Sequence, residues 1–142
     1  MRSVMILNGP NLNRLGTREP SVYGTDTFED LRALCIERGR LLGLEVDVRQ
    51  TNVESEMLAW LHDAADRRVP VILNPAAWTH TSVALRDACA MLTAPFIEVH
   101  LSNPASREDF RHRSMVADLA RGVIAGFGIR SYALALEALA DA

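Results

Sequence analysis

The chain contains no lysine, and all 15 of its basic residues are arginine. A Schiff base with a carbonyl substrate needs a primary amine, so the side chains of this sequence exclude that route. Cysteine is scarce as well, since Cys35 and Cys89 are the only two among 142 residues. Their spacing fits neither a metal site nor a disulfide framework, and we expect two buried free thiols of a reducing cytoplasm.

Other missing features exclude whole classes of partner. No apolar run approaches the roughly 18 residues of a membrane-spanning helix, and the start lacks the pattern of a signal peptide. The net charge is −3 with acids and bases mixed, which disfavours nucleic acid, and the basic run at residues 107–113 predicts a solvated face. Neither a glycine-rich phosphate loop nor a metal-ligand spacing of the histidines occurs. We therefore expect a cytoplasmic protein without a metal, a membrane partner or a nucleic-acid partner.

Two kinds of apolar pattern alternate along the chain. Strand-like runs are predicted at residues 4–7, 44–49, 69–73, 96–99 and 122–125, and helical periodicity at residues 28–42, 54–68, 82–92 and 128–139. Thr27 with Asp30 is typical of a helix start and Gly43 of a helix end, and the apolar stripe between them is predicted to reach Leu41 and Leu42. A short helix is also expected near residues 108–111.

Strands that alternate with helices predict a parallel sheet with helices on both faces. With 142 residues, 49% of them apolar, we expect one domain at residues 1–142. The predicted fold is α/β and flavodoxin-like, with five strands in the order 2-1-3-4-5. Ligands of such sheets bind beyond the carboxyl ends of the strands, at the switch point between strands 1 and 3.

The long loop at residues 8–24 follows the first predicted strand. It holds Arg18 and Tyr23, and a guanidinium beside a phenol stabilises the phenolate, so the pair is a candidate base. The alternative is a tyrosine packed over a loop and a solvated arginine. Asn8 and Asn11 favour a functional loop, because their amides can hold a water or polarise a developing oxyanion.

Glu98 and His100 end the fourth predicted strand. They are two residues apart and therefore share one face of the strand. A carboxylate beside an imidazole fixes its tautomer and stabilises its protonated form, which makes His100 a candidate general acid. The alternative is a solvated pair on an exposed strand face.

Further polar residues follow the third and fourth strands. Asn74 and His80 lie after the third strand, with His80 predicted at a helix start that would attract an anion. Ser102 offers a similar site, and Arg111 could meet a carboxylate with two hydrogen bonds. Together they predict a small, polyhydroxylated, carboxylated substrate.

Six stretches carry a resemblance to a known family. They are NGPNLNRLG (residues 8–16), REP (18–20), YG (23–24), NPAAWTHTSVALRD (74–87), EVHLSN (98–103) and REDFRH (107–112). In this order they resemble the type II 3-dehydroquinate dehydratases over nearly the whole length. The resemblance implies anti elimination of water from 3-dehydroquinate to give 3-dehydroshikimate, through an enolate and without a cofactor.

The resemblance also implies roles for single residues. Tyr23 would remove the proton at C2 with Arg18 holding it as phenolate, Asn11 would position a water at the enolate oxygen, and His100, oriented by Glu98, would protonate the departing hydroxyl. The implied substrate-binding residues are Asn74, His80, Leu101, Ser102 and Arg111. Asp87 would reach into the site of a neighbouring subunit, within trimers that assemble into a dodecamer.

Three alternatives accompany this interpretation. The same reaction serves both shikimate biosynthesis and quinate breakdown. An FMN-binding flavodoxin-like module would need a Ser/Thr/Gly-rich phosphate loop, yet residues 8–16 contain no serine or threonine. A receiver-type signalling domain would need clustered acids after the first strand and a late lysine, and the sequence has neither.

Overall fold

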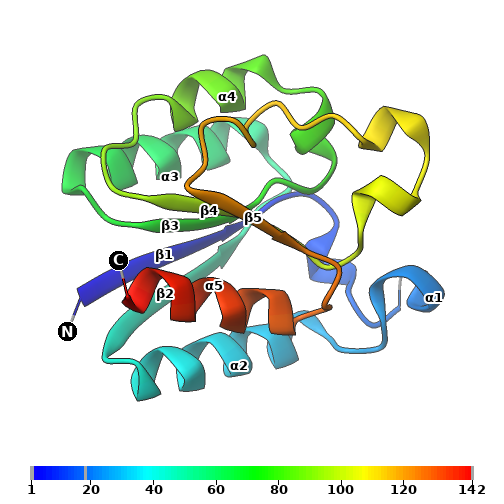
Figure 1. Ribbon diagram of the computed structural model, residues 1–142, viewed down its shortest axis with the longest axis horizontal. Coiled ribbons are helices and arrows are strands. Elements are labelled where there is room, and N and C mark those ends of the chain that lie inside the picture. Colours follow the sequence, from blue (N-terminus) through cyan, green and yellow to red (C-terminus); the bar gives the residue numbers. More distant parts are fainter. Residues whose placement is uncertain (1, 18, 142) are drawn as a thin grey trace.

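A parallel sheet of five strands runs through the middle of the protein, whose computed structural model describes residues 2–17 and 19–141. The strands are β1 (Arg2–Asn8), β2 (Leu44–Gln50), β3 (Val71–Asn74), β4 (Phe96–His100) and β5 (Gly122–Ala125). They pair in the order β2-β1-β3-β4-β5, so β2 and β5 are the edges (Figure 1). The predicted flavodoxin-like topology is therefore confirmed.

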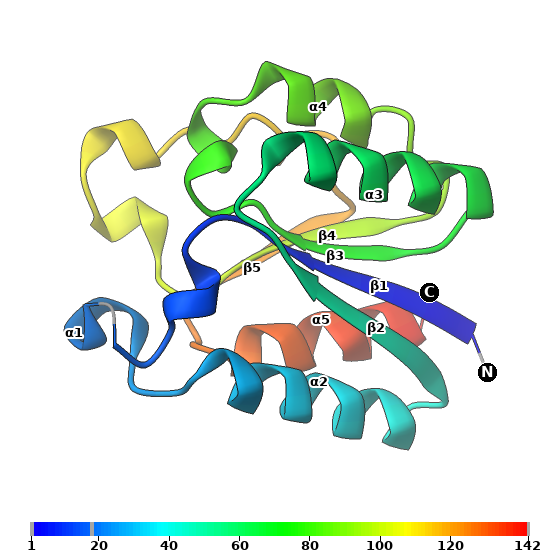
Figure 2. The same ribbon diagram turned by 180° about the vertical axis from the view of Figure 1, so that it is seen from behind.

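Helices cover both faces of the sheet. Helices α2 (Phe28–Leu41) and α5 (Arg130–Ala140) pack side by side on one face, and α3 (Glu54–Arg67) and α4 (Val83–Cys89) on the other (Figures 1 and 2). Side chains of a strand alternate between the faces, so β1 places Val4 and Ile6 in the core under α2 and α5, and Met5 and Leu7 in the core under α3 and α4. The central strand β1 is thus apolar on both sides.

Local sequence signals explain how α2 begins and ends. The Thr27 hydroxyl accepts from the Asp30 backbone N–H at 3.1 Å, and the Asp30 carboxylate accepts from the Thr27 N–H at 2.9 Å, so the predicted capping box is present. Gly43 follows the helix with a φ of 74°, the left-handed conformation in which glycine has no steric cost. These contacts confirm the predicted start and end of the helix.

Three local predictions are wrong. The helix predicted at residues 82–92 is shorter, because α4 ends at Cys89 and turns follow it. Leu41 is 62% exposed, because the buried positions of α2 are Leu31, Cys35 and Gly39 and Leu41 lies off that stripe. The segment predicted as one long loop at residues 8–24 contains a 3₁₀ helix, Leu12–Arg14, and the short helix α1 (Pro20–Tyr23).

Candidate active site

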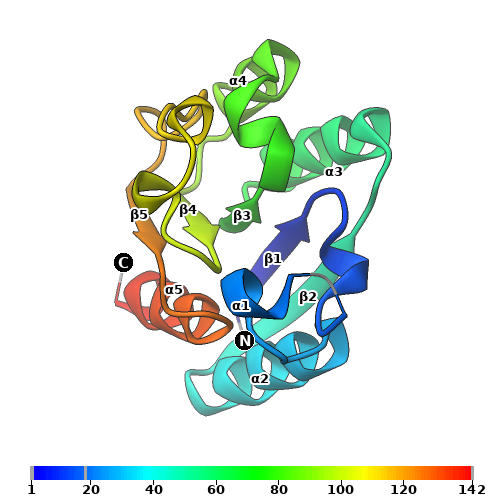
Figure 3. The same ribbon diagram turned by 90° about the vertical axis from the view of Figure 1, so that its right-hand side faces the viewer.

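The carboxyl ends of β1, β3 and β4 open into a cleft at the predicted switch point. Figures 1 and 3 show α1 and the segment after β4 beyond these strand ends. Most residues predicted for the site line this cleft: Asn11, Tyr23, Asn74, His80, His100, Leu101, Ser102 and Arg111. Three stretches of chain that are distant in sequence, one after each of these strands, therefore meet at one place.

Tyr23 faces the cleft with an arginine beside its hydroxyl. The Nη1 of Arg107 donates to the Tyr23 oxygen at 2.8 Å, and the guanidinium carbon lies 5.2 Å from the centre of the ring. A guanidinium that donates to a phenol oxygen stabilises the phenolate more than the phenol. The predicted partner, Arg18, lies outside the described residues.

Arg107 corrects the prediction of a solvated face at residues 107–113. Its side chain is only 15% exposed and, like Arg111, it lines the cleft. The Glu108 carboxylate lies 3.8 Å from the Nε of Arg107 and accepts from the Nε of Arg111 at 3.0 Å. The pKa of Glu108 is lowered, first by its own backbone N–H and then by Arg111. An exposed carboxylate thus holds two arginines over the cleft.

Glu98 and His100 form the predicted pair at the end of β4. The Nε2 of His100 lies 2.5 Å from Oε2 of Glu98, and both residues are buried. The other carboxylate oxygen, Oε1, accepts from the Ser114 hydroxyl at 2.7 Å. Because Nε2 is engaged by the carboxylate, Nδ1 is the ring nitrogen left for proton exchange with a ligand. The solvated-pair alternative is therefore wrong.

A buried amide–phenol network supports the floor of the cleft. Asn8 and Asn74 are partners in the register of β1 and β3, and both face α5. The Tyr132 hydroxyl donates to Oδ1 of Asn8 at 2.6 Å and accepts from Nδ2 of Asn74 at 2.9 Å. Burial raises the pKa of Tyr132, so this phenol stays neutral.

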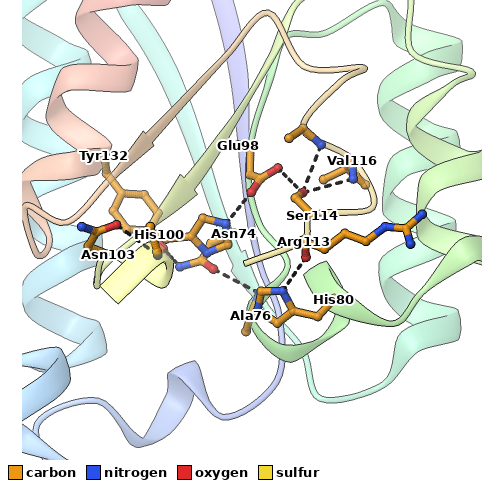
Figure 4. Close-up of polar contacts among 12 residues, drawn as sticks. Asn74, Ala76, His80, Glu98, His100, Asn103, Arg113, Ser114, Val116 and Tyr132 are labelled. Carbon is orange, nitrogen blue, oxygen red and sulfur yellow. Dashed lines mark hydrogen bonds and ion pairs between the residues drawn. The ribbon is translucent and has the colours of Figure 1, made fainter. Parts of the chain in front are cut away.

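The remaining contacts of Asn74 define its orientation. Its Oδ1 accepts from the Ala76 N–H at 3.1 Å while its Nδ2 points at Tyr132 (Figure 4). Each amide nitrogen carries two hydrogens, so one N–H of Asn74 remains for a ligand. Ala76 has a φ of 53°, which is strained for a residue with a Cβ, and it lines the cleft beside Asn74.

His80 closes the 3₁₀ helix Ala76–His80, three residues before α4, instead of opening a helix as predicted. Its Nδ1 lies 2.8 Å from the carbonyl oxygen of Arg113. A carbonyl only accepts, so Nδ1 carries a proton, and Nε2 is the ring nitrogen that remains for a ligand. His80 therefore lines the cleft from the end of a 3₁₀ helix and not from the start of a helix.

The loop that carries Asn11 is held by the segment that follows β2. Asn11 adopts a φ of 71°, a left-handed conformation that asparagine tolerates better than most residues. Its backbone N–H donates to Oδ1 of Asn52 at 2.9 Å. Gly9 passes so close to Pro75 that a Cβ would lie 2.6 Å from the Pro75 oxygen. The Asn11 loop therefore has a defined path over the strand ends.

Asp87 does not line the cleft. It is exposed on α4, which leaves its predicted reach into another subunit untested within one chain. The sequence missed three residues that act on the site, namely Arg107, Ser114 and Tyr132. Arg107 stands in a motif of the resemblance, whereas no local pattern marks the hydroxyls of Ser114 and Tyr132.

Within residues 2–17 and 19–141, no group of three or more His, Cys, Asp or Glu side chains is placed to hold a metal ion. No helix in this described part of the chain has the length and apolar character needed to cross a membrane.

The fold and the cleft together define an α/β protein with a polar cleft at the carboxyl ends of its strands, lined by groups that can bind a small molecule. The family model for dehydroquinase class II matches residues 2–140. The 3-dehydroquinate dehydratase of Salinispora tropica is 61% identical over 137 residues, 96% of each chain. The 3-dehydroquinate dehydratase of Mycobacterium leprae is 58% identical over 142 residues, 99% of this chain and 97% of the relative.

A solved structure agrees with these relatives. The type II dehydroquinase from Propionibacterium acnes superposes with a TM-score of 0.98 at 55% identity, and the match covers 100% of this chain and 98% of that one. The chain belongs to the class II dehydroquinase family. An FMN-binding module and a receiver domain are accordingly not favoured.

Proposed function

We propose that this chain catalyses the dehydration of 3-dehydroquinate to 3-dehydroshikimate, the reaction after which its relatives are named. The observation that carries the proposal is the placement of Tyr23 and His100 in one cleft, the first beside Arg107 and the second beside Glu98. An elimination next to a carbonyl needs one base and one acid, and these two rings supply them. The reaction belongs to the shikimate pathway.

Tyr23 is the base of the first step. Its phenolate, stabilised by the Arg107 guanidinium and in our proposal also by Arg18, removes a proton from C2 of the substrate. The electron pair of the broken C–H bond moves into the C3 carbonyl and forms an enolate. Asn11, which lines the cleft, holds a water against the enolate oxygen and so lowers the energy of the charge that develops there.

His100 is the acid of the second step. As the enolate reforms the ketone, the C–O bond at C1 breaks, and the hydroxyl leaves as water with a proton from the imidazole. Glu98 accepts from Nε2, so the Nδ1 edge of the ring gives up the proton. The proton taken by Tyr23 and the one lost by His100 are exchanged with solvent before the next turnover.

The other lining residues bind the substrate. Asn74 and His80 offer an amide N–H and an imidazole nitrogen to ring hydroxyls, while Leu101, Ser102 and Arg111 surround the carboxylate. Arg111 is suited to this role because Glu108 orients its Nε and leaves the rest of the guanidinium fork to a ligand. This donor set fits a polyhydroxylated carboxylate better than an apolar ligand.

We further propose a cytoplasmic homo-oligomer of trimers, assembled as a dodecamer, in which Asp87 completes the site of a neighbouring subunit. Two observations support this assembly. Asp87 is exposed and lies outside the cleft of its own chain, and several large apolar side chains are exposed on the single chain. Phe110 and Phe127 are 63% and 61% exposed. Exposed aromatic side chains are typical of surfaces that another protein covers.

The reaction is tested by following the conjugated product by absorbance, without added metal, for wild type and Tyr23→Phe. Wild type is expected to turn over and to resist borohydride, because no lysine can form a Schiff base. Tyr23→Phe is expected to lose at least about 100-fold in kcat, the scale of a general base. Absence of wild-type turnover rejects the function, and a fully active Tyr23→Phe rejects the base.

The shared site is tested by mixing two inactive variants, Tyr23→Phe and Asp87→Asn, after dissociation and reassembly. In a cyclic trimer each site pairs Tyr23 of one subunit with Asp87 of the next, so random mixing restores about one quarter of the wild-type sites. A return to about 25% of wild-type activity supports the arrangement. Mixtures that stay inactive, although light scattering shows mixed assemblies, contradict it.

A further inference from the structure

We propose that Ser114 is a positioning residue that keeps the proton of the Glu98–His100 pair on the imidazole. This inference rests on the proposed function, in which His100 is the acid. Ser114 lies 16 residues after Glu98 and donates to its Oε1 at 2.7 Å. Figure 4 shows the hydroxyl, the carboxylate and the imidazole joined in one line of hydrogen bonds.

The direction of the serine hydrogen follows from its partners. A hydroxyl has one donor hydrogen and two acceptor positions. The backbone N–H groups of Val116 and Ala117 donate to the Ser114 oxygen at 3.2 and 3.0 Å. An N–H cannot accept, so the hydroxyl hydrogen has only Glu98 as its acceptor among these contacts. Oε1 is consequently an acceptor and does not carry a proton.

This arrangement leaves one place for the proton that the pair shares. With Oε1 occupied by the serine hydrogen, the proton can lie only between Oε2 of Glu98 and Nε2 of His100, 2.5 Å apart. The Ser114 hydrogen bond stabilises the carboxylate form of Glu98 and so favours the proton on the ring. A charged imidazolium donates a proton to a departing hydroxyl far better than a neutral imidazole does.

The serine is held in place by the segment around it. The Met115 N–H donates to the Thr79 carbonyl at 2.8 Å, and Nη1 of Arg86 donates to the Met115 carbonyl at 2.9 Å. Arg86 also pairs with both carboxylate oxygens of Asp118, at 2.6 and 3.0 Å. These contacts tie residues 115–118 to α4 and to the segment before it, and Ser114 is therefore not a loop residue that could simply turn away.

Burial makes the hydroxyl hard to replace. Glu98 is 2% exposed and His100 is 7% exposed, so water has little access to Oε1 if the serine oxygen is removed. A buried carboxylate that loses a donor becomes a better proton acceptor. Without Ser114, the shared proton is expected to move toward Glu98 and leave a neutral imidazole facing the substrate.

Other ionisable groups surround the pair. His80, Arg111 and His112 share the hollow beside Glu98 and His100, and Tyr23 and Arg107 share the cleft with His100. The thiol of Cys89 on α4 is also affected by the Glu98 carboxylate. Burial, and then the negative charge of Glu98, raise the pKa of Cys89 to about 12. The thiol is neutral at the pH of any assay below that value. The arginines Arg107 and Arg111 are present in every Ser114 variant. A change in the pH dependence of kcat therefore results from the loss of the Ser114 hydroxyl.

The test compares Ser114→Ala with two control variants. Ser114→Thr keeps a hydroxyl at this position, and Ser106→Ala removes a serine hydroxyl elsewhere. Ser106 is exposed, and its hydroxyl donates only to the Asn103 carbonyl in the same turn. For Ser114→Ala we expect kcat to fall about tenfold, the effect of one hydrogen bond to a charged group, with KM changed less than about twofold. In Ser114→Ala the alkaline limb of the kcat–pH profile is expected to move to higher pH than in wild type. The reason is that the Glu98–His100 pair, taken as a unit, binds its shared proton more tightly when the serine donor is absent.

A readout without substrate separates this proposal from the proposed function. Side-chain ¹⁵N NMR of substrate-free protein is expected to show an imidazolium-type His100 in wild type, Ser114→Thr and Ser106→Ala, and a neutral-type ring in Ser114→Ala at the same pH. Unchanged ring signals and an unchanged alkaline limb in a folded Ser114→Ala would overturn the proposal. If wild type fails to dehydrate 3-dehydroquinate, the function falls, while the NMR comparison still decides the role of Ser114.

Discussion

Replacement of Tyr132 by phenylalanine is expected to lower the free energy of unfolding by about 2–6 kcal/mol. The variant deletes one oxygen that donates to Asn8 at 2.6 Å and accepts from Asn74 at 2.9 Å. Both amides are at most 3% exposed, so water does not replace the lost partner. Each buried polar group left without a partner costs roughly 1–3 kcal/mol, and the substitution creates two such groups.

Urea unfolding measures this loss. The fluorescence of Trp60 and Trp78 reports the transition, and the protomer concentration is kept equal because assembly also stabilises the folded chain. We expect a lower midpoint with an unchanged slope, since the surface exposed on unfolding is nearly the same. A loss of this size is a large part of the 5–15 kcal/mol that holds a typical domain together.

The chain supplies a matched control, because it has only two tyrosines. Tyr23→Phe deletes the same atom from a half-buried ring in the cleft, where solvent can replace the contact. Its unfolding free energy is expected to stay within about 0.5 kcal/mol of wild type while its activity collapses. If Tyr132→Phe unfolds at the same urea concentration as wild type, the network does not contribute to stability and our account of the cleft floor is refuted.

Two further predictions concern charge. Burial raises the pKa values of Cys35 and Cys89 from 9.0 to about 12, so the unfolded chain loses these protons above pH 9 while the folded chain keeps them. The contribution of the protonated thiols to the free energy of unfolding is therefore fully present below pH 9, and it is lost between pH 9 and 12 by up to about 1.4 kcal/mol per pH unit for each thiol. Urea midpoints of wild type and of the double alanine variant, measured across this pH range, check the slope. Arg107→Gln is expected to reduce kcat at least about tenfold with little change in the urea midpoint, because it removes a charged donor from Tyr23; an active variant would contradict that role.

Local patterns predicted most of the fold. Thr27 with Asp30 and Gly43 define α2 through contacts only a few residues apart, and such contacts can be inferred from spacing alone. The period of two in β4 predicted that Glu98 and His100 share a face, because alternation along a strand needs no tertiary information. Leu41 shows the limit of periodicity, since an apolar residue next to a helical stripe can lie off the face that packs on the sheet, which in α2 holds Leu31 and Cys35.

The missed parts of the site depend on contacts across the fold. Arg107 reaches Tyr23 over 84 positions, and Tyr132 reaches Asn8 over 124. A charged run such as residues 107–113 gives no indication of which arginine turns inward, because direction depends on the neighbouring segment. Helix α1 has four residues, too few for a helical pattern to emerge from a loop rich in proline and glycine.

The bond between Asn8 and Tyr132 has a consequence for how the protein is made. Synthesis proceeds from residue 8 toward residue 132, so the strand that carries the asparagine leaves the ribosome long before the helix that carries its phenol partner. Until then, the amides of Asn8 and Asn74 at the tips of two central strands have no phenol to satisfy them. The nascent chain is thus expected to assemble much of its sheet early and to acquire a competent pocket only in its final stage of synthesis.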